Sequence, residues 1–536
     1  MTTSSLADDL LRPDAYPWSP DHVERIETHI SWVFLAGDRV VKVKRPVRLP
    51  FVDHTTAEAR RRSCESEVRL NARLTDDVYL GTVPITRGPR GHEVDGEGAP
   101  VEWATLMRRL PADRMLDELI TSGNLPEGWV ERLADRLVDF NLRASPPCAG
   151  DAEALAAMAT GVLVDNVDEL RPLFRDRPFV VELSLIDAAV RAFIAANQGL
   201  LLRRAREGWI REGHGDLRAE HICLEPDGRV QVFDCVEFNR DIRCADIASD
   251  LAFLLMDLDR LGIDECATDR IVDRYRQAGL DLPADLLGLY WVHRALVRAK
   301  IAGIEMAESD EDDDAPQLAV AAGYLHTAAR HAITCRPIVI AMTGISGTGK
   351  STVARHLARV LRADHHRSDV VRKALAGREG PAASAWRSGL YGEDWTAATY
   401  ARLAELAEES IAAGRPVILD ATFLDGGQRA AAAAIAREHD APFLLVETVC
   451  DEAVLERRLE ERAARGDDPS DADVEVMRRQ RRMLAERPPG VPDGALVATI
   501  DTTPAGYVDL DPALLVLRDA GVVASRITGV TDREGR

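Results

Sequence analysis

Residues 336–352 read Arg-Pro-Ile-Val-Ile-Ala-Met-Thr-Gly-Ile-Ser-Gly-Thr-Gly-Lys-Ser-Thr, and this stretch decides the fold of the C-terminal part of the chain. Gly344, Gly349, Lys350 and Ser351 stand at the spacing G-x-x-x-x-G-K-[ST] of a phosphate-binding loop, or P-loop. The apolar run before the loop predicts a buried strand, and apolar residues at helical spacing follow it. The motif therefore has both the strand and the helix that it requires.

This arrangement is typical of a site for a nucleoside triphosphate. Backbone N–H groups hold the phosphates, and glycine lets the backbone curl closely around them. The start of the following helix adds the positive end of its dipole. We expect Lys350 to reach the β- and γ-phosphates of ATP and the Ser351 hydroxyl to ligate Mg²⁺. The predicted nucleotide-binding residues of this loop are Gly344, Ser346, Gly347, Thr348, Gly349, Lys350, Ser351 and Thr352.

Length and composition indicate more than one globular domain. At 536 residues the chain exceeds an ordinary domain, so two or three are expected. Hydrophobic residues make up 46% and charged residues 29%, which gives ample material for a core. The formal net charge of −22 disfavours a nucleic-acid partner, because neutralising a phosphate backbone requires a basic surface. A local basic pocket for a small anion is still compatible with this charge.

Cysteine usage and the N-terminus predict a cytoplasmic protein. The eight cysteines include no C-x-x-C pair and no zinc-like cluster, so we expect reduced, mostly buried thiols. The N-terminus lacks the basic and apolar segments of a signal peptide. No run approaches the ~18 apolar residues of a membrane span, so no membrane partner is expected.

The N-terminal part contains a second candidate nucleotide site. Apolar residues on either side of Gly37 predict a β-hairpin, and Lys42 and Lys44 share one face of its second strand. A helix predicted over 55–74, opened by a capping box, contains Glu67. Hairpin, strand lysine and acidic helix together are typical of the phosphate-binding part of a protein-kinase-type nucleotide lobe. We therefore predict that Lys42, Lys44 and Glu67 bind nucleotide. Ordinary solvated lysines on a strand are the alternative.

Residues 213–221 read Gly-His-Gly-Asp-Leu-Arg-Ala-Glu-His, and an apolar run that follows them ends at Asp234. These stretches resemble the catalytic and metal-binding loops of aminoglycoside phosphotransferases, whose pattern is H-G-D-L-H-x-x-N followed by a strand that ends in Asp. The resemblance implies that Asp216 is the catalytic aspartate, which accepts the proton of the acceptor hydroxyl. It also implies that Asp234 ligates Mg²⁺.

Two positions depart from this pattern. Arg218 replaces the usual histidine, and His221 stands where the family carries its metal-binding asparagine. Imidazole is a softer ligand than an amide oxygen and suits Mn²⁺ better than Mg²⁺. We therefore expect His221 and Asp234 to form a metal site that favours Mn²⁺. A retained fold with weakened or lost activity is the alternative for this half of the chain.

The C-terminal part has its own candidate acceptor site. Residues 368–372, Ser-Asp-Val-Val-Arg, resemble the S-D-x-x-R segment of small P-loop kinases, which include polynucleotide 5′-kinases and zeta-toxin-like sugar-nucleotide kinases. The resemblance implies that Asp369 contacts the acceptor hydroxyl and that Arg372 anchors an anionic part of the acceptor. A carboxylate in that place can also accept the hydroxyl proton. Asp420 ends a later apolar strand, a Walker-B-like position that would hold Mg²⁺.

A basic helix follows the next predicted strand, and residues 455–465, together with residues 470–472 and Gln480, form a predicted lid. Arg458, Arg462 and Arg465 stand at i, i+4 and i+7, so they share one helical face. Guanidinium groups placed there would suit a lid that clamps the moving phosphate charge, and we predict catalytic roles for Arg458 and Arg462. An ordinary solvated helix is the alternative.

Taken over its length, the chain resembles uncharacterised bacterial fusions of an aminoglycoside phosphotransferase-like domain with an AAA-type predicted kinase domain. We expect an α/β protein with a bilobal protein-kinase-like domain at 1–334 and a P-loop domain with a parallel sheet at 335–536.

Three functions remain open on the sequence. The first is an ATP-dependent kinase that acts on the hydroxyl of a small metabolite, with chemistry in the P-loop domain and conceivably in both. The second is a regulatory switch, in which a degenerate kinase-like half senses a ligand and the P-loop half only hydrolyses ATP. The third is a nucleic-acid 5′-hydroxyl kinase, which the acidic charge disfavours. Asp369 and Arg372 favour the first, because a pure ATPase needs no acceptor site.

Overall fold

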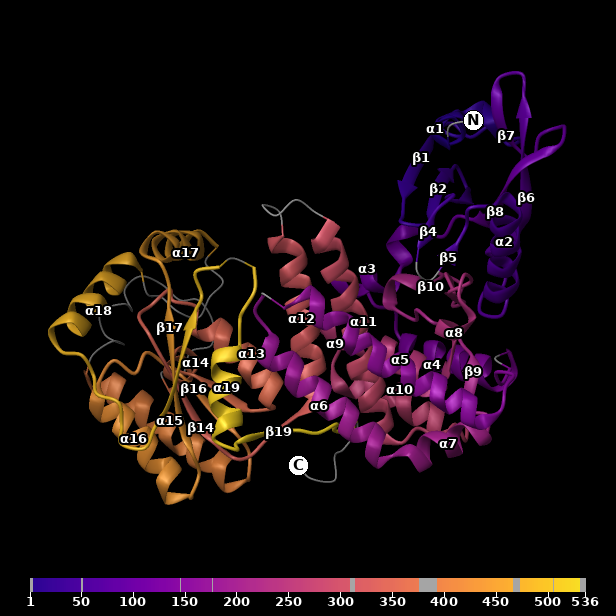
Figure 1. Cartoon of the computed structure of the whole chain (residues 1–536). Helices are drawn as coiled ribbons and strands as arrows, with labels where there is room; N and C mark the ends of the chain where they lie inside the picture. The colour runs from indigo at the N-terminus through magenta and orange to yellow at the C-terminus, as the bar shows by residue number, and fades with distance from the viewer. Residues whose placement is uncertain are drawn as a thin grey trace. The chain divides into compact units, whose positions relative to one another are not determined.

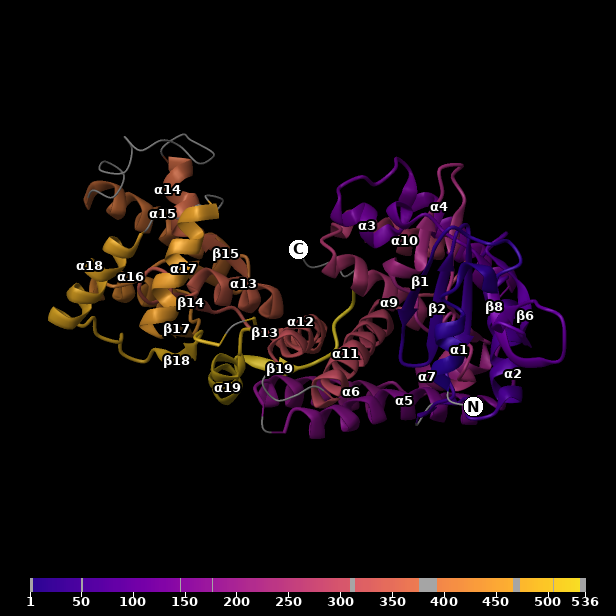
Figure 2. The same ribbon diagram turned by 90° about the horizontal axis from the view of Figure 1, so that it is seen from above.

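The structure, a computed structural model, describes residues 3–49, 52–144, 146–175, 177–308, 314–375, 393–465, 473–504 and 506–530. Contacts divide the chain into two compact units, each of which draws on two stretches of sequence. The first unit contains the residues up to Gly161 together with Asn197–Trp291, and the second contains Val162–Ala196 and Val292–Val530. Each unit is described by itself below (Figures 1 and 2).

The first unit contains a six-stranded antiparallel sheet in the order β1-β2-β3-β8-β6-β7. Its strands are β1 (Val23–Glu27), β2 (Ser31–Ala36), β3 (Arg39–Lys44), β6 (Tyr79–Gly88), β7 (Gly91–Val94) and β8 (Pro100–Arg108). The predicted hairpin is confirmed: β2 and β3 pair around Gly37, whose φ of 69° favours glycine. A small hairpin of β4 (Arg48–Leu49) and β5 (Val52–Asp53) follows.

Helix α2 (Ala57–Asn71) packs against this sheet. Its N-cap is Thr56, whose hydroxyl accepts a hydrogen bond from the Ala59 N–H at 3.2 Å. The predicted helix over 55–74 is therefore confirmed but shorter at both ends. The helix presents Glu67 to the sheet, where the carboxylate is buried.

The rest of the first unit is mostly helical and forms a second lobe. Its helices are α3 (Leu116–Thr121), α4 (Trp129–Asp139), α7 (Gln198–Arg206), α8 (Arg240–Arg243), α9 (Ile247–Arg260), α10 (Glu265–Gln277) and parts of α5 (Ala152–Leu173) and α11 (Ala284–Glu308). Two small antiparallel pairs carry its loops: β9 (Ile210–Glu212) with β12 (Cys244–Asp246), and β10 (Ile222–Leu224) with β11 (Val230–Val232). A sheet lobe and a helical lobe give the expected kinase-like architecture.

The second unit is built around a five-stranded parallel sheet in the order β15-β16-β14-β17-β18. The strands are β14 (Val339–Thr343), β15 (Asp364–Arg367), β16 (Val417–Asp420), β17 (Phe443–Val449) and β18 (Leu496–Asp501). The helices that follow the P-loop are α13 (Lys350–Leu361), α14 (Ser368–Leu375), α15 (Glu393–Ala412), α16 (Gly426–Glu438), α17 (Glu452–Arg465), α18 (Val474–Glu486) and α19 (Asp511–Asp519). The predicted P-loop domain with a parallel sheet is confirmed.

Strand β14 lies at the centre of this sheet, and all five of its side chains are buried. Side chains alternate between the faces of a strand. Val339 and Ala341 accordingly lie in the core beneath α15 and α16, together with Val417 and Leu419 of β16. A continuous apolar run of this kind is typical of a parallel strand that is covered on both faces.

Two helices from the first part of the sequence belong to the P-loop unit. Helix α6 (Val180–Ala196) packs against α12 (Ala315–Ala332) and α19, and α12 in turn packs against α13. The Asp511 carboxylate accepts hydrogen bonds from the N–H groups of Val181 and Glu182 at 2.9 Å, which caps the start of α6. Strand β13 (Ile333–Cys335) pairs with β19 (Val523–Ser525). The contacts therefore do not divide the chain at the boundary predicted near Cys335.

Among the residues that the structure describes, no helix is both long enough and apolar enough to span a bilayer.

The packing of α12 yields a test of its place in the P-loop unit. Leu325→Ala should lower the free energy of unfolding of this unit by about 2–5 kcal/mol, because the fully buried side chain would leave a cavity. Hydrogen exchange of the β14 amides would measure the loss. Val320→Ala, on the same helix but 43% exposed, is the matched control. Equal effects of the two substitutions would contradict this packing.

Candidate functional site

The P-loop connects β14 to α13 through three glycines with positive φ. Gly344 has a φ of 141°, and a Cβ at this position would lie 2.7 Å from the Thr448 hydroxyl and 2.8 Å from its carbonyl oxygen. Only glycine fits this turn, because the loop passes directly beside the end of β17. The motif therefore forms the strand, loop and helix that the sequence predicts.

Backbone carbonyl groups of the P-loop accept hydrogen bonds from neighbouring side chains. The Lys350 ammonium and the Thr348 hydroxyl both donate to the Ile345 carbonyl oxygen, each at 2.8 Å. The Thr502 hydroxyl donates to the Thr348 carbonyl at 2.9 Å, so the segment after β18 braces the loop from outside. Lys350 is thus folded towards the space that the loop encloses, where a phosphate would replace the carbonyl as its partner.

A side chain of α18 occupies one of the loop amides. The Ser346 N–H donates to the Gln480 side-chain oxygen at 2.8 Å. Backbone N–H groups of this loop are the expected phosphate donors, so a bound nucleotide would compete with Gln480 for Ser346. The sequence placed Gln480 on a predicted lid, but nothing in the motif marked this contact.

Charged side chains from three elements act on Lys350. Burial lowers the pKa of Lys350 to about 8, although the carboxylates of Asp420 and Asp369 act to raise it. The cation of Arg462 lowers it further. Three predicted site residues, from β16, α14 and α17, therefore lie within electrostatic reach of the P-loop lysine.

Asp420 and Ser351 lie together at the carboxyl end of β16. Burial by itself would raise the pKa of Asp420, but hydrogen bonds from His365 and Ser351 outweigh burial and hold the pKa below its usual range. The His365 Nε2 atom lies 3.2 Å from the Asp420 carboxylate. A carboxylate beside a hydroxyl offers the hard oxygen ligands that Mg²⁺ prefers, so the residues fit the predicted metal role.

Asp369 and Arg372 form an ion pair on the first turn of α14. The Arg372 guanidinium donates to the Asp369 carboxylate at 2.9 Å. The sequence predicts separate roles for these residues on the acceptor. In the structure the two side chains pair with each other.

The two predicted lid arginines have different surroundings. Arg458 donates to the carbonyl and to the hydroxyl of Thr502 and so holds the segment that braces the P-loop. Arg462 lies close enough to Lys350 to act on its charge. A clamp on transferring phosphate stays a prediction for both. The side chain of Arg465 and residues 470–472, assigned to the same lid, lie outside the described residues.

In the first unit, Lys42 joins two predicted site residues. Its ammonium lies 2.7 Å from the Glu67 carboxylate and 2.5 Å from the Asp234 carboxylate. Burial would lower the pKa of Lys42, but Asp234 and Glu67 outweigh it and raise the pKa well above its ordinary value. The strand lysine, the acidic helix and the loop of Asp234 thus meet, which brings together residues that two separate sequence patterns predict. Nucleotide binding by Lys42 and Glu67 stays a prediction.

Lys44 lies beside Lys42 and forms buried ion pairs of its own. Its side chain is fully buried and lies 2.9 Å from Glu67 and 2.5 Å from Glu237. A nucleotide role for Lys44 stays a prediction. Glu237 was not singled out in the sequence, and its position three residues after Asp234 is the signal that could have suggested it.

His221 lies between the two loops of the first unit. Its Nδ1 atom is 2.8 Å from the Asp216 carbonyl oxygen, and its Nε2 atom is 3.7 Å from the Asp234 carboxylate. In the part of the chain that the structure describes, no three His, Cys, Asp or Glu side chains are grouped so that they could hold a metal ion. A metal at His221 and Asp234 therefore stays a prediction.

Asp216 is held by the residue that departs from the family pattern. The Arg218 guanidinium donates to both carboxylate oxygens of Asp216, each at 2.9 Å. Burial would raise the pKa of Asp216, but the charge of Arg218 outweighs burial and brings it to about 2. A carboxylate so stabilised is a weak base. The presence of arginine at position 218, where the family has histidine, did not by itself predict this bidentate ion pair.

The prediction that all eight cysteines are reduced is wrong for two of them. Cys148 and Cys244 form a disulfide between positions 96 residues apart in the chain. The other six are free thiols: Cys64, Cys223, Cys235, Cys266, Cys335 and Cys450. Tertiary structure pairs the two, since Cys244 opens β12, β12 pairs with β9, and the Cys148 N–H donates to the Ile210 carbonyl of β9. No local spacing could reveal that pair.

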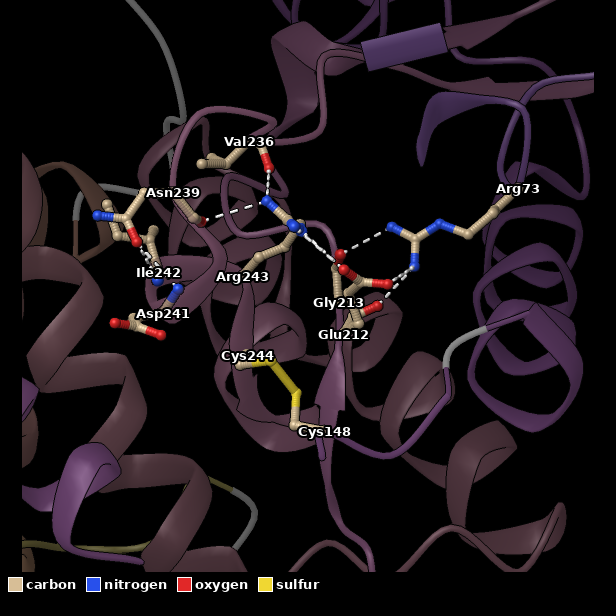
Figure 3. Close-up of a disulfide and its surroundings, with 10 residues drawn as sticks. All are labelled: Arg73, Cys148, Glu212, Gly213, Val236, Asn239, Asp241, Ile242, Arg243 and Cys244. Atoms are coloured by element: carbon tan, nitrogen blue, oxygen red, sulfur yellow. Dashed lines mark hydrogen bonds and ion pairs between the residues drawn. A yellow bond between two sulfur atoms is a disulfide. The ribbon is translucent and has the colours of Figure 1, made fainter. Parts of the chain in front are cut away.

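The disulfide supports the segment that carries the predicted catalytic loop (Figure 3). Strand β9 runs directly into Gly213, whose N–H donates to the Arg243 carbonyl at 2.9 Å. The Arg243 side chain donates to Glu212 at 3.1 Å and to the Val236 carbonyl at 2.8 Å. The cross-linked pair of β9 and β12 therefore holds the start of the predicted catalytic loop at Gly213. Through Arg243 it also holds the following loop at Val236.

Removing the disulfide should weaken this support. The double variant Cys148→Ser, Cys244→Ser should lower the free energy of unfolding of the first unit by about 4 kcal/mol, since a long loop is no longer closed in the unfolded chain. Thermal unfolding, with hydrogen exchange over 210–216, would measure the loss, and Cys266→Ser at an exposed free thiol is the control. Thiol titration of the unreduced, unfolded wild type should find six thiols; eight would contradict the pairing.

Solved structures of kinases resemble parts of the chain. A choline/ethanolamine kinase family protein from Mesorhizobium loti is 14% identical and matches 61% of this chain and 94% of its own, with a TM-score of 0.38. The GDP complex of aminoglycoside 2′-phosphotransferase-IIIa is 16% identical and matches 58% of this chain and 94% of its own, with a TM-score of 0.36. A gluconokinase from Sinorhizobium meliloti is 18% identical and matches 34% of this chain and 93% of its own, with a TM-score of 0.25.

Sequence relatives cover most of the chain. Rv2004c of Mycobacterium tuberculosis is 32% identical over 471 residues, which are 86% of this chain and 90% of the relative. Mb2027c of Mycobacterium bovis matches with the same identity and coverage, and both are described as uncharacterized proteins. The family described as AAA domain matches residues 339–488. The chain therefore belongs to the family of these mycobacterial proteins, and in it a protein-kinase-like part is joined to a C-terminal AAA domain.

Proposed function

We propose that the P-loop unit transfers the γ-phosphoryl group of ATP to the hydroxyl group of a small metabolite. The observation that carries the proposal is the position of Asp369 within electrostatic reach of Lys350. Lys350 belongs to the phosphate site, whereas Asp369 lies in the first turn of α14, the helix after β15, and β16 separates β15 from the P-loop strand β14. An enzyme that only hydrolyses ATP needs no carboxylate on an acceptor side.

Each residue of the site has its own role in the proposed phosphoryl transfer. The acceptor hydroxyl oxygen forms a new bond to the γ-phosphorus, the bond from that phosphorus to the β-phosphate oxygen breaks, and ADP leaves. Asp369 accepts the hydroxyl proton. Lys350 and Arg462 stabilise the charge of the phosphoryl group in transit. A Mg²⁺ ion, held by Ser351 and Asp420 as directly bound or water-linked ligands, would neutralise the phosphates when bound.

The net charge of the chain and one ion pair in the first unit help to choose among the three possible functions. The net charge of −22 disfavours a nucleic-acid acceptor, so a small molecule is the proposed partner. A second candidate function concerns the first unit, where Arg218 occupies both oxygens of Asp216. This ion pair favours a kinase-like unit that binds ATP with Mn²⁺ or Mg²⁺ as a regulatory sensor and does not transfer phosphate.

The pKa of Lys350 predicts how nucleotide affinity depends on pH. Only the charged ammonium attracts phosphate, and its pKa in the nucleotide-free protein lies at about 8. ATP affinity of the P-loop site should therefore fall as the pH rises through 8, by at most about tenfold for each further pH unit. Lys350→Arg, whose side chain stays charged, should remove this fall whatever its affinity at neutral pH.

Calorimetric titration of the full chain between pH 7 and pH 9 measures the effect. The Lys350→Ala chain supplies the background from any nucleotide site in the first unit. Binding should also take up protons above pH 8, which titrations in buffers of different ionisation enthalpy detect. A pH-independent affinity in the wild type would show that Lys350 does not contact the phosphates.

Acceptor-side variants test the transfer itself. Asp369→Asn should lower the rate of transfer by about 10²–10⁴-fold, since the proton acceptor is lost, and should leave ATP affinity nearly unchanged. Arg372→Ala should likewise impair transfer more than ATP binding. Lys350→Ala should lower turnover about a hundredfold or more.

A screen of alcohols, sugars, aminoglycosides and 5′-hydroxyl oligonucleotides, read out as ADP and phosphorylated product, provides the assay. The full chain is used throughout, because α6 and α12 belong to the P-loop unit. Collapse of ATP binding in the Asp369→Asn chain would place Asp369 in the nucleotide site. Turnover that survives Lys350→Ala would move the chemistry to the first unit.

A further inference from the structure

A cavity of about 530 Å³ lies between α15 and α16, beside the end of β16. Alanine residues face each other across it, including Ala397 and Ala401 on α15 and Ala431 on α16. These three alanines are exposed, so the cavity opens to solvent. A volume of this size, lined by alanines and by larger apolar side chains such as Leu403 and Phe423, is typical of a ligand site.

Tyr400 connects the cavity with the reacting groups. Its ring lines the cavity, and its hydroxyl accepts a hydrogen bond from the Phe423 N–H at 3.3 Å. The charges of Arg372 and Asp369 both act on the Tyr400 hydroxyl. The predicted acceptor-side ion pair therefore lies within electrostatic reach of a hydroxyl that belongs to the cavity lining.

The loop after β16 links the cavity with the P-loop. Phe423 lines the cavity, and the carbonyl oxygen of the preceding residue, Thr422, accepts hydrogen bonds from the Thr343 hydroxyl at 3.0 Å and from the Gly344 N–H at 3.4 Å. One peptide thus separates the cavity wall from the first residue of the phosphate loop. A ligand in the cavity would have its near end close to the transferring phosphate.

The walls carry almost no charge. Among the described lining residues, Asp425 has the only carboxylate, and it caps α16 by accepting from the N–H groups of Gly427 and Gln428 at 2.8 and 3.2 Å. No lysine, arginine or histidine lines the cavity in this described part of the chain. Arg372 is paired with Asp369, so in this proposal it positions that carboxylate and does not anchor an anionic part of the acceptor, the role that the resemblance implies. An anionic ligand body would lose its hydration here without gaining a cation.

We propose that the phosphate acceptor is an uncharged alcohol with an apolar carbon skeleton, whose skeleton occupies the cavity between α15 and α16. The hydroxyl group of that alcohol points past Tyr400 towards Asp369 and the γ-phosphate. The proposal rests on the function proposed above and names its substrate class. It excludes sugar phosphates, sugar acids and nucleic acids as the natural acceptors of this site.

Filling the cavity tests the proposal with matched controls. Ala401→Trp and Ala431→Trp place a large ring in the cavity from opposite walls, at exposed positions where the fold tolerates it. Ala398→Trp and Ala430→Trp make the same change at exposed alanines of the same helices that do not line the cavity. The probes are cyclohexylmethanol, cyclohexanecarboxylate and glycerol, which separate the effects of apolar skeleton and charge.

Saturation-transfer NMR on the full chain detects probe binding, and product analysis with ATP detects transfer. We expect cyclohexylmethanol to bind in the wild type and in Lys350→Ala, and its KM to rise about tenfold or more when either cavity wall carries tryptophan. The two control substitutions should leave its KM unchanged, and ATP affinity should be the same in all four tryptophan variants as in the wild type. Neither cyclohexanecarboxylate nor glycerol should compete.

The outcomes separate this proposal from the one on which it rests. Lack of cyclohexylmethanol binding, equal binding of the carboxylate, or no effect of the cavity substitutions would overturn the acceptor class. If a sugar or a charged compound is then phosphorylated in a Lys350-dependent reaction, the kinase function stands and only the proposed acceptor class fails. If no acceptor in the screen receives phosphate, the proposed function fails, and binding of cyclohexylmethanol alone does not rescue it.

Discussion

The P-loop unit depends on how it accommodates one buried ammonium group. Burial disfavours the charge of Lys350, and its pKa falls to about 8 even with two carboxylates nearby. The protein supplies the Ile345 carbonyl as a direct partner and places Asp420 and Asp369 around it. Because a nucleotide phosphate carries far more negative charge than a carbonyl, it is the better partner for this cation. The incompletely compensated lysine thereby gives the loop an electrostatic preference for phosphate.

The first unit compensates its buried cations fully. Lys42 and Lys44 share Glu67, and each has a further carboxylate, Asp234 or Glu237. Three carboxylates for two ammonium groups leave an excess of negative charge, which a divalent cation would neutralise. At the other loop, Arg218 neutralises Asp216. The two units thus differ in electrostatics: one presents a poorly compensated lysine to phosphate, and the other has its lysines and its predicted catalytic aspartate already paired.

What the sequence predicted correctly rests on local patterns with a physical cause. The strand before the P-loop, the turn at Gly37 and the strand end at Asp420 each follow from neighbouring residues. The helix near Thr55 was also predicted, but its cap is Thr56 and not Thr55, the first residue of the predicted capping box. Features that depend on distant residues were missed. The Cys148–Cys244 disulfide, the contact of Gln480 with Ser346, and the packing of α6 with α19 join positions that share no local signal. Arg218 was noticed as a departure, yet its geometry on Asp216 required the structure.

The interleaved course of the chain has a consequence for its synthesis. Helix α6 ends at residue 196, whereas its partner α19 begins at residue 511, so 314 residues lie between them. At the usual pace of the ribosome this interval lasts roughly 15–60 seconds. During that time the apolar face of α6, including Leu183 and Ile186, lacks part of its final cover. The nascent chain therefore presents a hydrophobic segment that holding chaperones could recognise well before the phosphate-binding half has been translated.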